Sequence, residues 1–283
     1  MQKGERIKSD KGTYIILKTI GKGKRGTVFL ADFHPHKGTS YIRTSVALKI
    51  LDVLVVEDTC PLFANKIRLI DFEKEIRNNI AFSHTHIPTL IDSFKHNGIP
   101  CLAMKYIDGC SLFDFVDRHG PLPETESIRI IEEVALIIEA MHSMHLLHLD
   151  ISPNNILLCN DSAYIIDLGN SMQYLENGIA SDETAIRQGQ LEYTPLELIN
   201  CNTNLFLPAM DIYSLCATMY YALTGATPPN SKSISEHGKL PVHELEHIGV
   251  SKTLIELLIE GMQADYQKRI SNIGDFISSL RKI

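Results

Sequence analysis

The sequence predicts an α+β protein of two lobes, because the spacing of its apolar residues changes once along the chain. Over residues 14–106, short runs rich in β-branched and aromatic residues dominate, and one helical stretch near 67–82 interrupts them. After residues 108–110, apolar residues recur with the spacing of an amphipathic helix. We therefore expect an antiparallel β-sheet with one main helix in the first lobe, followed by a mostly helical second lobe.

The expected strands of the first lobe are short apolar runs bounded by turn residues. They cover residues 14–20, 27–33, 45–51, 90–94 and 100–106. We expect this lobe to span residues 1–106 and the second lobe to span 107–283, with a polar hinge at 106–109.

The strongest helical repeat of the second lobe follows residues 121–125, where prolines and a glutamate mark a helix start. Its apolar residues recur at i, i+3, i+4 and i+7, which is typical of a helix face that packs into a core. They are Ile130, Ile131, Val134, Ile137, Ile138 and Met141.

Composition narrows the class of protein. The chain has 283 residues, 44% of them hydrophobic, which is enough for an ordinary globular core. A formal charge of −7 argues against a nucleic-acid-binding surface, and no apolar run is long enough to span a membrane. The six cysteines lack metal-ligand spacing, so we expect free thiols in a reducing compartment. These features predict a cytoplasmic protein without nucleic-acid or membrane partners, and we expect no further domain at either end.

A glycine-rich segment lies between two strand-like runs. Residues 20–28 follow the pattern GxGxxGxV, with Gly21, Gly23, Gly26 and Val28 at its fixed positions. Glycine suits a loop whose backbone amides approach phosphates closely. A dinucleotide-binding loop would open a helix instead, and a glycine-rich hairpin without ligand is the other alternative. Because residues 28–30 continue as a strand, the pattern favours a hairpin over a dinucleotide site.

A lysine lies on an apolar strand, in the segment Val46-Ala47-Leu48-Lys49, where a solvent-exposed edge lysine is the plain alternative. Glu75 follows 26 residues later (75 − 49) in a helical segment. A glutamate there can pair with Lys49 and aim it at the α- and β-phosphates of a nucleotide. Glu73 competes for this role, but it lies two residues earlier and faces elsewhere on a helix.

The candidate catalytic groups lie in two segments, 148–155 and 167–169. These segments place Asp150, Asn155 and Asp167 in the order that phosphoryl transfer from ATP requires. Asp150 can orient an acceptor hydroxyl and accept its proton. Asn155 and Asp167 offer hard oxygen ligands to Mg²⁺, which bridges the phosphates and offsets charge on the transferred group.

Together, these motifs resemble those of the eukaryotic-type (Hanks-type) protein kinase family, and the resemblance covers residues 14–280. It implies a bilobal protein-kinase-like fold. It also implies that Met104 is the gatekeeper residue, and that the Lys105 carbonyl and the Ile107 amide hydrogen-bond the adenine of ATP. Apolar contacts with the base are implied for Val28, Ala47, Leu112 and Leu157.

The resemblance extends to the second lobe. Glu197 matches the glutamate that closes the activation segment, and Arg269 matches its buried ion-pair partner. The segment that begins at Asp211 resembles the helix that anchors the catalytic loop.

Several positions depart from the family pattern, among them Pro195-Leu196, which stands where Ala-Pro usually precedes the closing glutamate. Leu149 replaces the arginine that usually precedes the catalytic aspartate. The positive charge that would pair with a phosphate on the activation loop is therefore missing. Ser152 and Gln190 stand where serine/threonine kinases usually carry lysine and threonine. Asn79 puts a polar group where a hydrophobic helix contact is expected.

Histidines recur every third residue at His142, His145 and His148, a spacing that raises the alternative of a metal-binding face. No cysteine or carboxylate is clearly placed to complete such a site. We therefore expect His148 to brace the catalytic loop by hydrogen bonding and packing.

We predict an ATP- and Mg²⁺-dependent protein kinase that acts on a protein substrate, with serine and threonine favoured over tyrosine. Two alternatives stay open. A small-molecule kinase of related fold would share the catalytic groups, whereas a nucleotide-binding pseudokinase would serve as a scaffold. The glycine loop, Glu197 and the Asp211 segment favour the protein-kinase branch, and the complete set of catalytic groups disfavours a pseudokinase.

Overall fold

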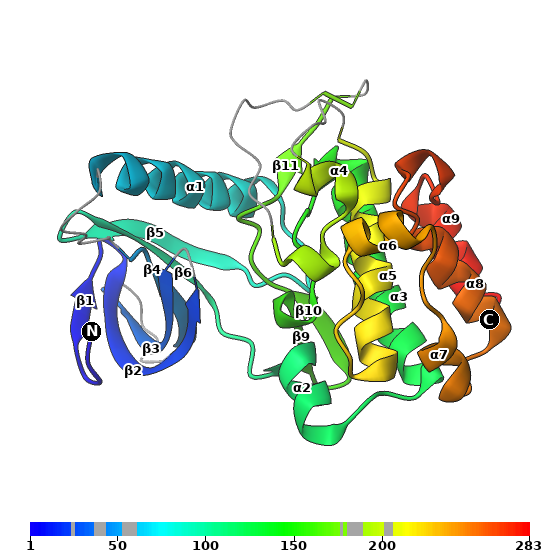
Figure 1. Ribbon diagram of the computed structural model, residues 1–283. Helices are drawn as coiled ribbons and strands as arrows, with labels where there is room; N and C mark the ends of the chain where they lie inside the picture. Colours follow the sequence, from blue (N-terminus) through cyan, green and yellow to red (C-terminus); the bar gives the residue numbers. More distant parts are fainter. Residues whose placement is uncertain (24–25, 37–43, 53–60, 176–177, 180–188, 201–205) are drawn as a thin grey trace. The chain divides into compact units, whose positions relative to one another are not determined.

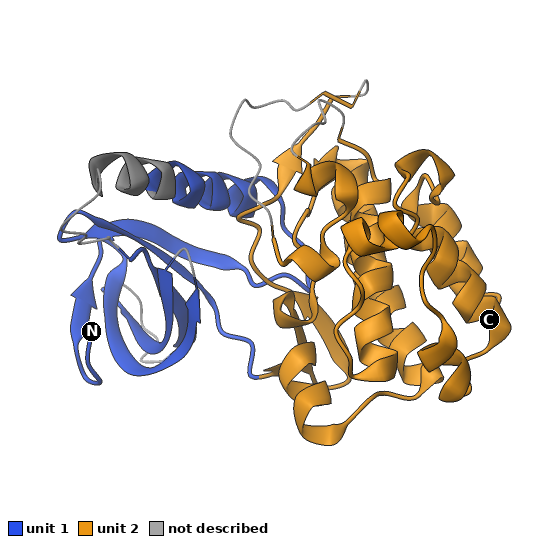
Figure 2. Ribbon diagram, in the orientation of Figure 1, with its two compact units in different colours: residues 1–108 blue, residues 109–283 orange. Residues whose placement is uncertain are grey.

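The computed structural model describes residues 1–23, 26–36, 44–52, 61–175, 178–179, 189–200 and 206–283. The chain divides into two compact units, residues 1–108 and 109–283 (Figure 2). The first is an antiparallel sheet with one long helix and the second is mostly helical, which confirms the predicted α+β, bilobal class. In the described part, no helix combines the length and the apolarity needed to cross a lipid bilayer.

Unit 1 contains a six-stranded antiparallel sheet with the order β1-β2-β3-β4-β6-β5 (Figure 1). Its strands are β1 (Arg6–Lys8), β2 (Gly12–Gly23), β3 (Gly26–Pro35), β4 (Thr44–Ile50), β5 (Leu90–His96) and β6 (Ile99–Lys105). Every predicted strand is present. Strand β1 was missed, because its three residues contain a single apolar side chain and show no period.

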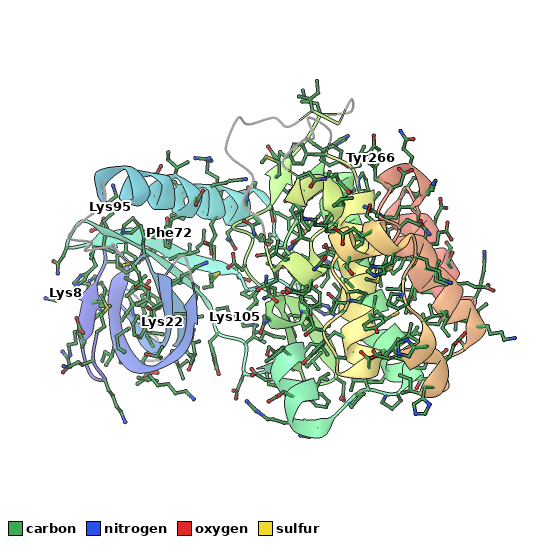
Figure 3. All side chains as sticks on the ribbon, in the orientation of Figure 1. Lys8, Lys22, Phe72, Lys95, Lys105 and Tyr266 are labelled. Carbon is green, nitrogen blue, oxygen red and sulfur yellow. The ribbon has the colours of Figure 1, made fainter. Side chains whose placement is uncertain are left out.

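The helix of unit 1, α1 (Pro61–Ala81), packs against one face of this sheet. Phe72 projects from α1 toward the strands and is fully buried with Leu51 and Leu102 (Figure 3). The opposite face has its own buried cluster, in which Tyr14 stacks between Phe33 and Phe94 at ring-centroid distances of 4.7 and 5.2 Å. Alternate residues of each strand therefore serve two different cores, as the period of two requires.

Unit 2 begins with short elements that surround the candidate catalytic residues. They are β7 (Cys110–Ser111), α2 (Leu112–His119), α3 (Glu124–Ser143), β8 (Leu146–Leu147), η1 (Pro153–Asn155), β9 (Ile156–Cys159), β10 (Ser162–Ile165) and β11 (Met172–Gln173). The predicted apolar stripe of α3 is buried along its whole length, from Ile130 to Met141. This burial confirms that the repeat forms a core face.

The rest of unit 2 surrounds one central helix. The elements are η2 (Leu191–Tyr193), α4 (Leu196–Ile199), α5 (Ala209–Thr224), α6 (Ser231–His237), α7 (His243–His247), α8 (Lys252–Gly261), η3 (Tyr266–Lys268) and α9 (Ile273–Leu280). Helix α5 is buried on all sides from Ala209 to Leu223 and packs against α3, α8 and α9 (Figure 1). A helix with apolar residues on all its faces needs such a central position, and α5 is therefore the core helix of the unit.

Candidate active site

The strand register of unit 1 brings its candidate site residues to one face of the sheet. Residues opposite each other in an antiparallel pair project to the same face, as do residues two apart in one strand. Gly21 is opposite Val28, Val28 is opposite Lys49, and Ala47 is opposite Met104. Lys105 ends β6, and Ile107 follows this strand.

The glycines of the hairpin between β2 and β3 differ in what they do for the fold. Gly26 has φ 152°, and a Cβ atom there would collide with the carbonyl oxygen of Ile50. At Gly21 and Gly23, the nearest atoms would lie at 3.8 and 4.0 Å, which is ordinary contact. The fold itself therefore requires glycine at position 26, whereas the described residues give no steric reason for the other two. Lys24 and Arg25, which lie between Gly23 and Gly26 in the sequence, are outside the described residues.

Lys49 forms a buried ion pair with Glu75. The distance between Lys49 Nζ and Glu75 Oε1 is 2.5 Å, and the two side chains are 7% and 0% exposed. Glu73, the competing candidate, is exposed to solvent. Helical spacing explains why Lys49 pairs with Glu75 and not with Glu73. Residues 71, 72, 74 and 75 of α1 are buried, whereas Glu73 between them points to solvent.

Asn79, one of the departures from the family pattern, has a local role in α1. Its Nδ2 donates a hydrogen bond to the main-chain oxygen of Glu75 at 2.8 Å. The side chain thereby satisfies its polar group within the helix, which explains why a polar residue is tolerated at a half-buried position.

The catalytic loop of unit 2 is anchored on Asp211 of α5, as the family resemblance implied. The fully buried carboxylate accepts hydrogen bonds from the main-chain N–H groups of His148 at 2.9 Å and Leu149 at 2.8 Å. Burial by itself would raise the pKa of Asp211. The hydrogen bond and the charge of His142, whose Nε2 lies 2.8 Å from Asp211 Oδ2, outweigh burial and hold the pKa below its usual value.

Leu149 takes part in an apolar cluster in place of the expected arginine. Its φ of 61° lies in the left-handed region, which costs about 1–2 kcal/mol for such a residue. The hydrogen bond from its N–H to buried Asp211 helps to offset this strain. The side chain is 4% exposed and packs in a cluster of six buried apolar residues: Leu147, Leu149, Met172, Leu198, Phe206 and Met210.

This cluster connects the catalytic loop to the segment that follows Asp167. Met172 belongs to β11, which pairs with β8, and the N–H of Tyr174 donates to the carbonyl of His145 at 3.0 Å. Strand pairing and apolar packing thus hold residues 172–174 on the catalytic loop. Sequence reasoning noted the missing arginine but could not find its replacement, because the cluster joins residues far apart in the chain.

Asp150, Asn155 and Asp167 are tied together through the backbone. Asn155 Nδ2 donates to the Asp150 main-chain oxygen at 2.8 Å, and the Ile166 N–H donates to the Asn155 main-chain oxygen at 2.9 Å. Asp167 has φ 67°, and its Oδ1 accepts from the Gly169 N–H at 3.0 Å. Because Nδ2 is used by the loop, the Asn155 side-chain oxygen is the atom available to a ligand. One amide oxygen and one carboxylate fit Mg²⁺, which takes few protein ligands when it also binds phosphates.

The three regularly spaced histidines have different partners. His142 pairs with Asp211, and His148 Nδ1 accepts a hydrogen bond from the Asp150 N–H at 3.2 Å. The ring of His145 lies beside Tyr174, with centroids 5.4 Å apart. The fully buried His148 therefore braces the catalytic loop, as predicted. Within the described ranges, no group of three or more His, Cys, Asp or Glu residues could hold a metal ion.

The ion pair predicted between Glu197 and Arg269 is confirmed. Arg269 Nη1 lies 2.8 Å from Glu197 Oε1, and Nη2 lies 3.3 Å from Oε2, so the contact is bidentate. The guanidinium also lies over the ring of Tyr213, 5.2 Å from its centroid. Arg269 is 4% exposed and donates further hydrogen bonds to the carbonyls of Gln263 and Ala209. The pair fastens the end of the segment 189–197 to α5.

The chain is similar in sequence to several curated serine/threonine-protein kinases. Serine/threonine-protein kinase PknH of Mycobacterium tuberculosis (strain ATCC 25618 / H37Rv) is 26% identical over 277 residues, which cover 95% of this chain and 42% of PknH. PknD of the same strain is 26% identical over 279 residues (95% of this chain, 39% of PknD), and PknE is 25% identical over 275 residues (93% and 45%). The chain spans less than half the length of these curated relatives.

The match also holds at the level of the family. A family model described as the protein kinase domain matches residues 14–280, which is nearly the whole chain. The chain therefore belongs to the protein kinase domain family, which confirms the resemblance inferred from its motifs.

Proposed function

We propose that this chain transfers the γ-phosphoryl group of ATP to a serine or threonine hydroxyl of a protein substrate. The observation that carries this proposal is the folded catalytic loop. Asp211 fixes the loop through two main-chain N–H groups, and the loop in turn connects Asp150 to Asn155 and to the strand that leads to Asp167. Rigid positioning of this kind is what phosphoryl transfer needs, since the reaction depends on alignment and charge stabilisation.

Each group has a chemical role in this proposal. Asp150 accepts the hydrogen bond of the substrate hydroxyl, orients it and takes its proton. Lys49, aimed by Glu75, binds phosphate oxygens, and the hairpin from Gly21 to Gly26 covers the phosphates with main-chain N–H groups. Asn155 and Asp167 would hold Mg²⁺, which when bound neutralises charge on the phosphates.

The adenine contacts remain those implied by the family. Met104 is the proposed gatekeeper, with the Lys105 carbonyl and the Ile107 amide as hydrogen-bond partners of the base. Val28 and Ala47 share the sheet face of Lys49, which supports their proposed contact with the nucleotide. Leu157 on β9 and Leu112 at the start of α2 are proposed as further apolar contacts. The similar proteins PknH and PknD are serine/threonine-protein kinases, which supports serine/threonine specificity.

Incubation of the chain with γ-labelled ATP, Mg²⁺ and candidate substrates tests the proposal. We expect label to appear on serine or threonine of protein substrates. Label on small molecules alone would support a small-molecule kinase. ATP binding without any transfer would support a pseudokinase, and label on tyrosine would contradict the proposed specificity.

Removal of phosphate from the activation segment should leave activity nearly unchanged. Among the described residues, Met172 and Tyr174 are held against Leu149 by apolar packing. Phosphatase-treated enzyme should keep its initial rate within about twofold, a difference of about 0.4 kcal/mol in barrier. A drop of about tenfold, or 1.4 kcal/mol, that autophosphorylation reverses would contradict this expectation. The candidate phosphate acceptors Ser181 and Thr184, and the basic Arg187, lie outside the described residues; Ser171 and Tyr174 lie within them.

Cys110 should react with a thiol reagent, and Mg-ATP should protect it. Cys110 and Cys159 are half-buried, whereas Cys101 and Cys216 are buried. Burial raises the pKa of the Cys101 thiol to about 11 and raises that of Cys216 as well, so neither offers a reactive thiolate near pH 7. By family resemblance, Cys110 lies next to Ser111 at the ribose end of the nucleotide site.

Peptide mapping after labelling measures each thiol separately. Cys159 is the internal control, because it has similar exposure but no proposed contact with nucleotide. Cys110 labelling that saturating Mg-ATP does not slow would count against the proposed alignment of the adenine-binding segment. Cys60 and Cys201 lie outside the described residues.

A further inference from the structure

The segment after residue 188 packs directly on the catalytic aspartate. A Cβ atom at Gly189 would collide with Asp150 Oδ1, so the backbone of Gly189 lies against this carboxylate. The next residue, Gln190, is fixed through its main-chain oxygen, which accepts from the Tyr193 N–H at 3.0 Å and from Thr194 Oγ1 at 2.8 Å. Thr194 is only 4% exposed. Gln190 therefore has a defined place beside Asp150 and an exposed side chain.

At the same place, the catalytic loop presents the uncharged amide of Asn154. Ser152 is 1% exposed, and its hydroxyl has no hydrogen-bond partner among the described residues, so this position projects nothing outward. Asn154, two residues later, is exposed on η1. Its Nδ2 lies 3.4 Å from Gln190 Oε1. Ser152 and Gln190 are the two departures from the family pattern in this region. In their place, the structure has a contact between the uncharged side chains of Asn154 and Gln190.

Two primary amides that share one hydrogen bond keep unused hydrogen-bonding groups. Each carboxamide has two N–H donors and one carbonyl acceptor. After one mutual bond, the pair still has three N–H groups and the carbonyl of the donating amide. The same count holds if both amides are rotated by 180°, because Gln190 then donates the hydrogen bond and Asn154 accepts it. The pair therefore offers donors and an acceptor together, next to the group that orients the substrate hydroxyl.

We propose that the Asn154–Gln190 amide pair binds the main chain of the polypeptide substrate next to the phosphorylated residue. A peptide unit carries one N–H donor and one C=O acceptor, which is the complement of what the pair offers. Gln190 directly follows Gly189, and consecutive Cα atoms are about 3.8 Å apart. The peptide unit recognised is thus within one or two residues of the acceptor. The inference rests on the proposed protein kinase function and names two residues that select for a polypeptide.

Steady-state kinetics with an alanine-flanked serine peptide test this pair. Asn154→Ala and Gln190→Ala should each raise the KM for the peptide about three- to tenfold, the effect of a lost neutral hydrogen bond, and leave the KM for ATP unchanged. The double variant should show less than the product of the single effects, because the two amides act as a unit. Asn200→Ala and Gln267→Ala remove the same amides from other exposed positions of unit 2 and should leave both constants unchanged.

Main-chain recognition has a separate signature in the substrate. Peptides methylated at one backbone nitrogen at a time should show one position, within two residues of the serine, where methylation raises the KM of the wild-type chain. In the double variant, that penalty should disappear. Variants that bind and phosphorylate the peptide like the wild-type chain would overturn the inference while leaving the kinase function intact.

Equilibrium binding separates the two proposals. Anisotropy of the fluorescently labelled peptide, measured with a non-hydrolysable ATP analogue and Mg²⁺, reports binding whether or not transfer occurs. A wild-type chain that binds the peptide through the pair but does not transfer phosphate would contradict the proposed catalytic function alone. Equal peptide affinity of wild-type and double variant, including no measurable binding by either, would overturn the role of the pair.

Discussion

Asp150→Asn and Asp167→Asn are each expected to abolish phosphoryl transfer, but they should differ in nucleotide binding. Asp150 is proposed to face the acceptor. An amide there could not take the hydroxyl proton, whereas ATP should still bind. Asp167 is a proposed metal ligand, so its loss should weaken Mg²⁺-dependent ATP binding as well. Transfer is measured with γ-labelled ATP, and binding is measured by calorimetry with and without Mg²⁺.

Both variants should remain folded, because each replaces a carboxylate by an amide of the same shape. Asp117→Asn is the matched control, since it makes the same change at an exposed position of α2 and should keep full activity. Thermal unfolding checks that all three variants are as stable as the wild-type chain. Undiminished phosphorylation by a folded Asp150 or Asp167 variant would remove the basis of the assignment.

The parts of the fold that could be predicted are those with strong local periodicity. Strands β2–β6 carry short β-rich apolar runs, and α3 repeats its apolar residues with the helical period of 3.6. These local patterns indicate strand and helix, respectively. Glu75 could be distinguished from Glu73 for a similar reason, since side chains two positions apart on a helix point in different directions. The structure agrees by pairing Lys49 with Glu75.

Other features depend on contacts between distant residues and have no local signature. The cluster around Leu149 draws on Met172, Leu198 and Met210, which belong to three other elements. A leucine at position 149 shows only that an arginine is absent, and the packing that replaces it appears once the chain is folded. The contact of Asn154 with Gln190 is similar, since these residues are 36 positions apart.

The glycines of the GxGxxGxV pattern are present for two different physical reasons. Gly26 is required by the positive φ and by the Ile50 carbonyl, whatever the hairpin binds. Gly21 and Gly23 have no comparable neighbour in the described residues. Close approach of a phosphate, as proposed, would give a reason for glycine at these two positions. A sequence pattern alone cannot separate these two reasons.

Lys49→Ala should lower turnover by a factor on the order of 10² to 10³, because it removes the proposed phosphate contact. Glu75→Gln should have a smaller effect, since the lysine keeps its charge but loses the partner that aims it. Glutamine is preferable to alanine here, because removing one partner of a buried ion pair outright destabilises a protein by about 3–5 kcal/mol. Turnover is measured at saturating ATP, with thermal unfolding as the check on stability.

The combination of the two changes is the decisive measurement. If Glu75 acts only through Lys49, the Lys49→Ala/Glu75→Gln double variant should be no slower than Lys49→Ala alone. Two exposed residues of unit 1 provide matched controls. Glu73→Gln on α1 should leave turnover unchanged, and so should Lys95→Ala on β5 (Lys95 is labelled in Figure 3). Losses that multiply in the double variant would mean that Glu75 contributes independently of the lysine. The 2.5 Å ion pair would then be a structural contact of unit 1 and not the device that aims Lys49 at the phosphates.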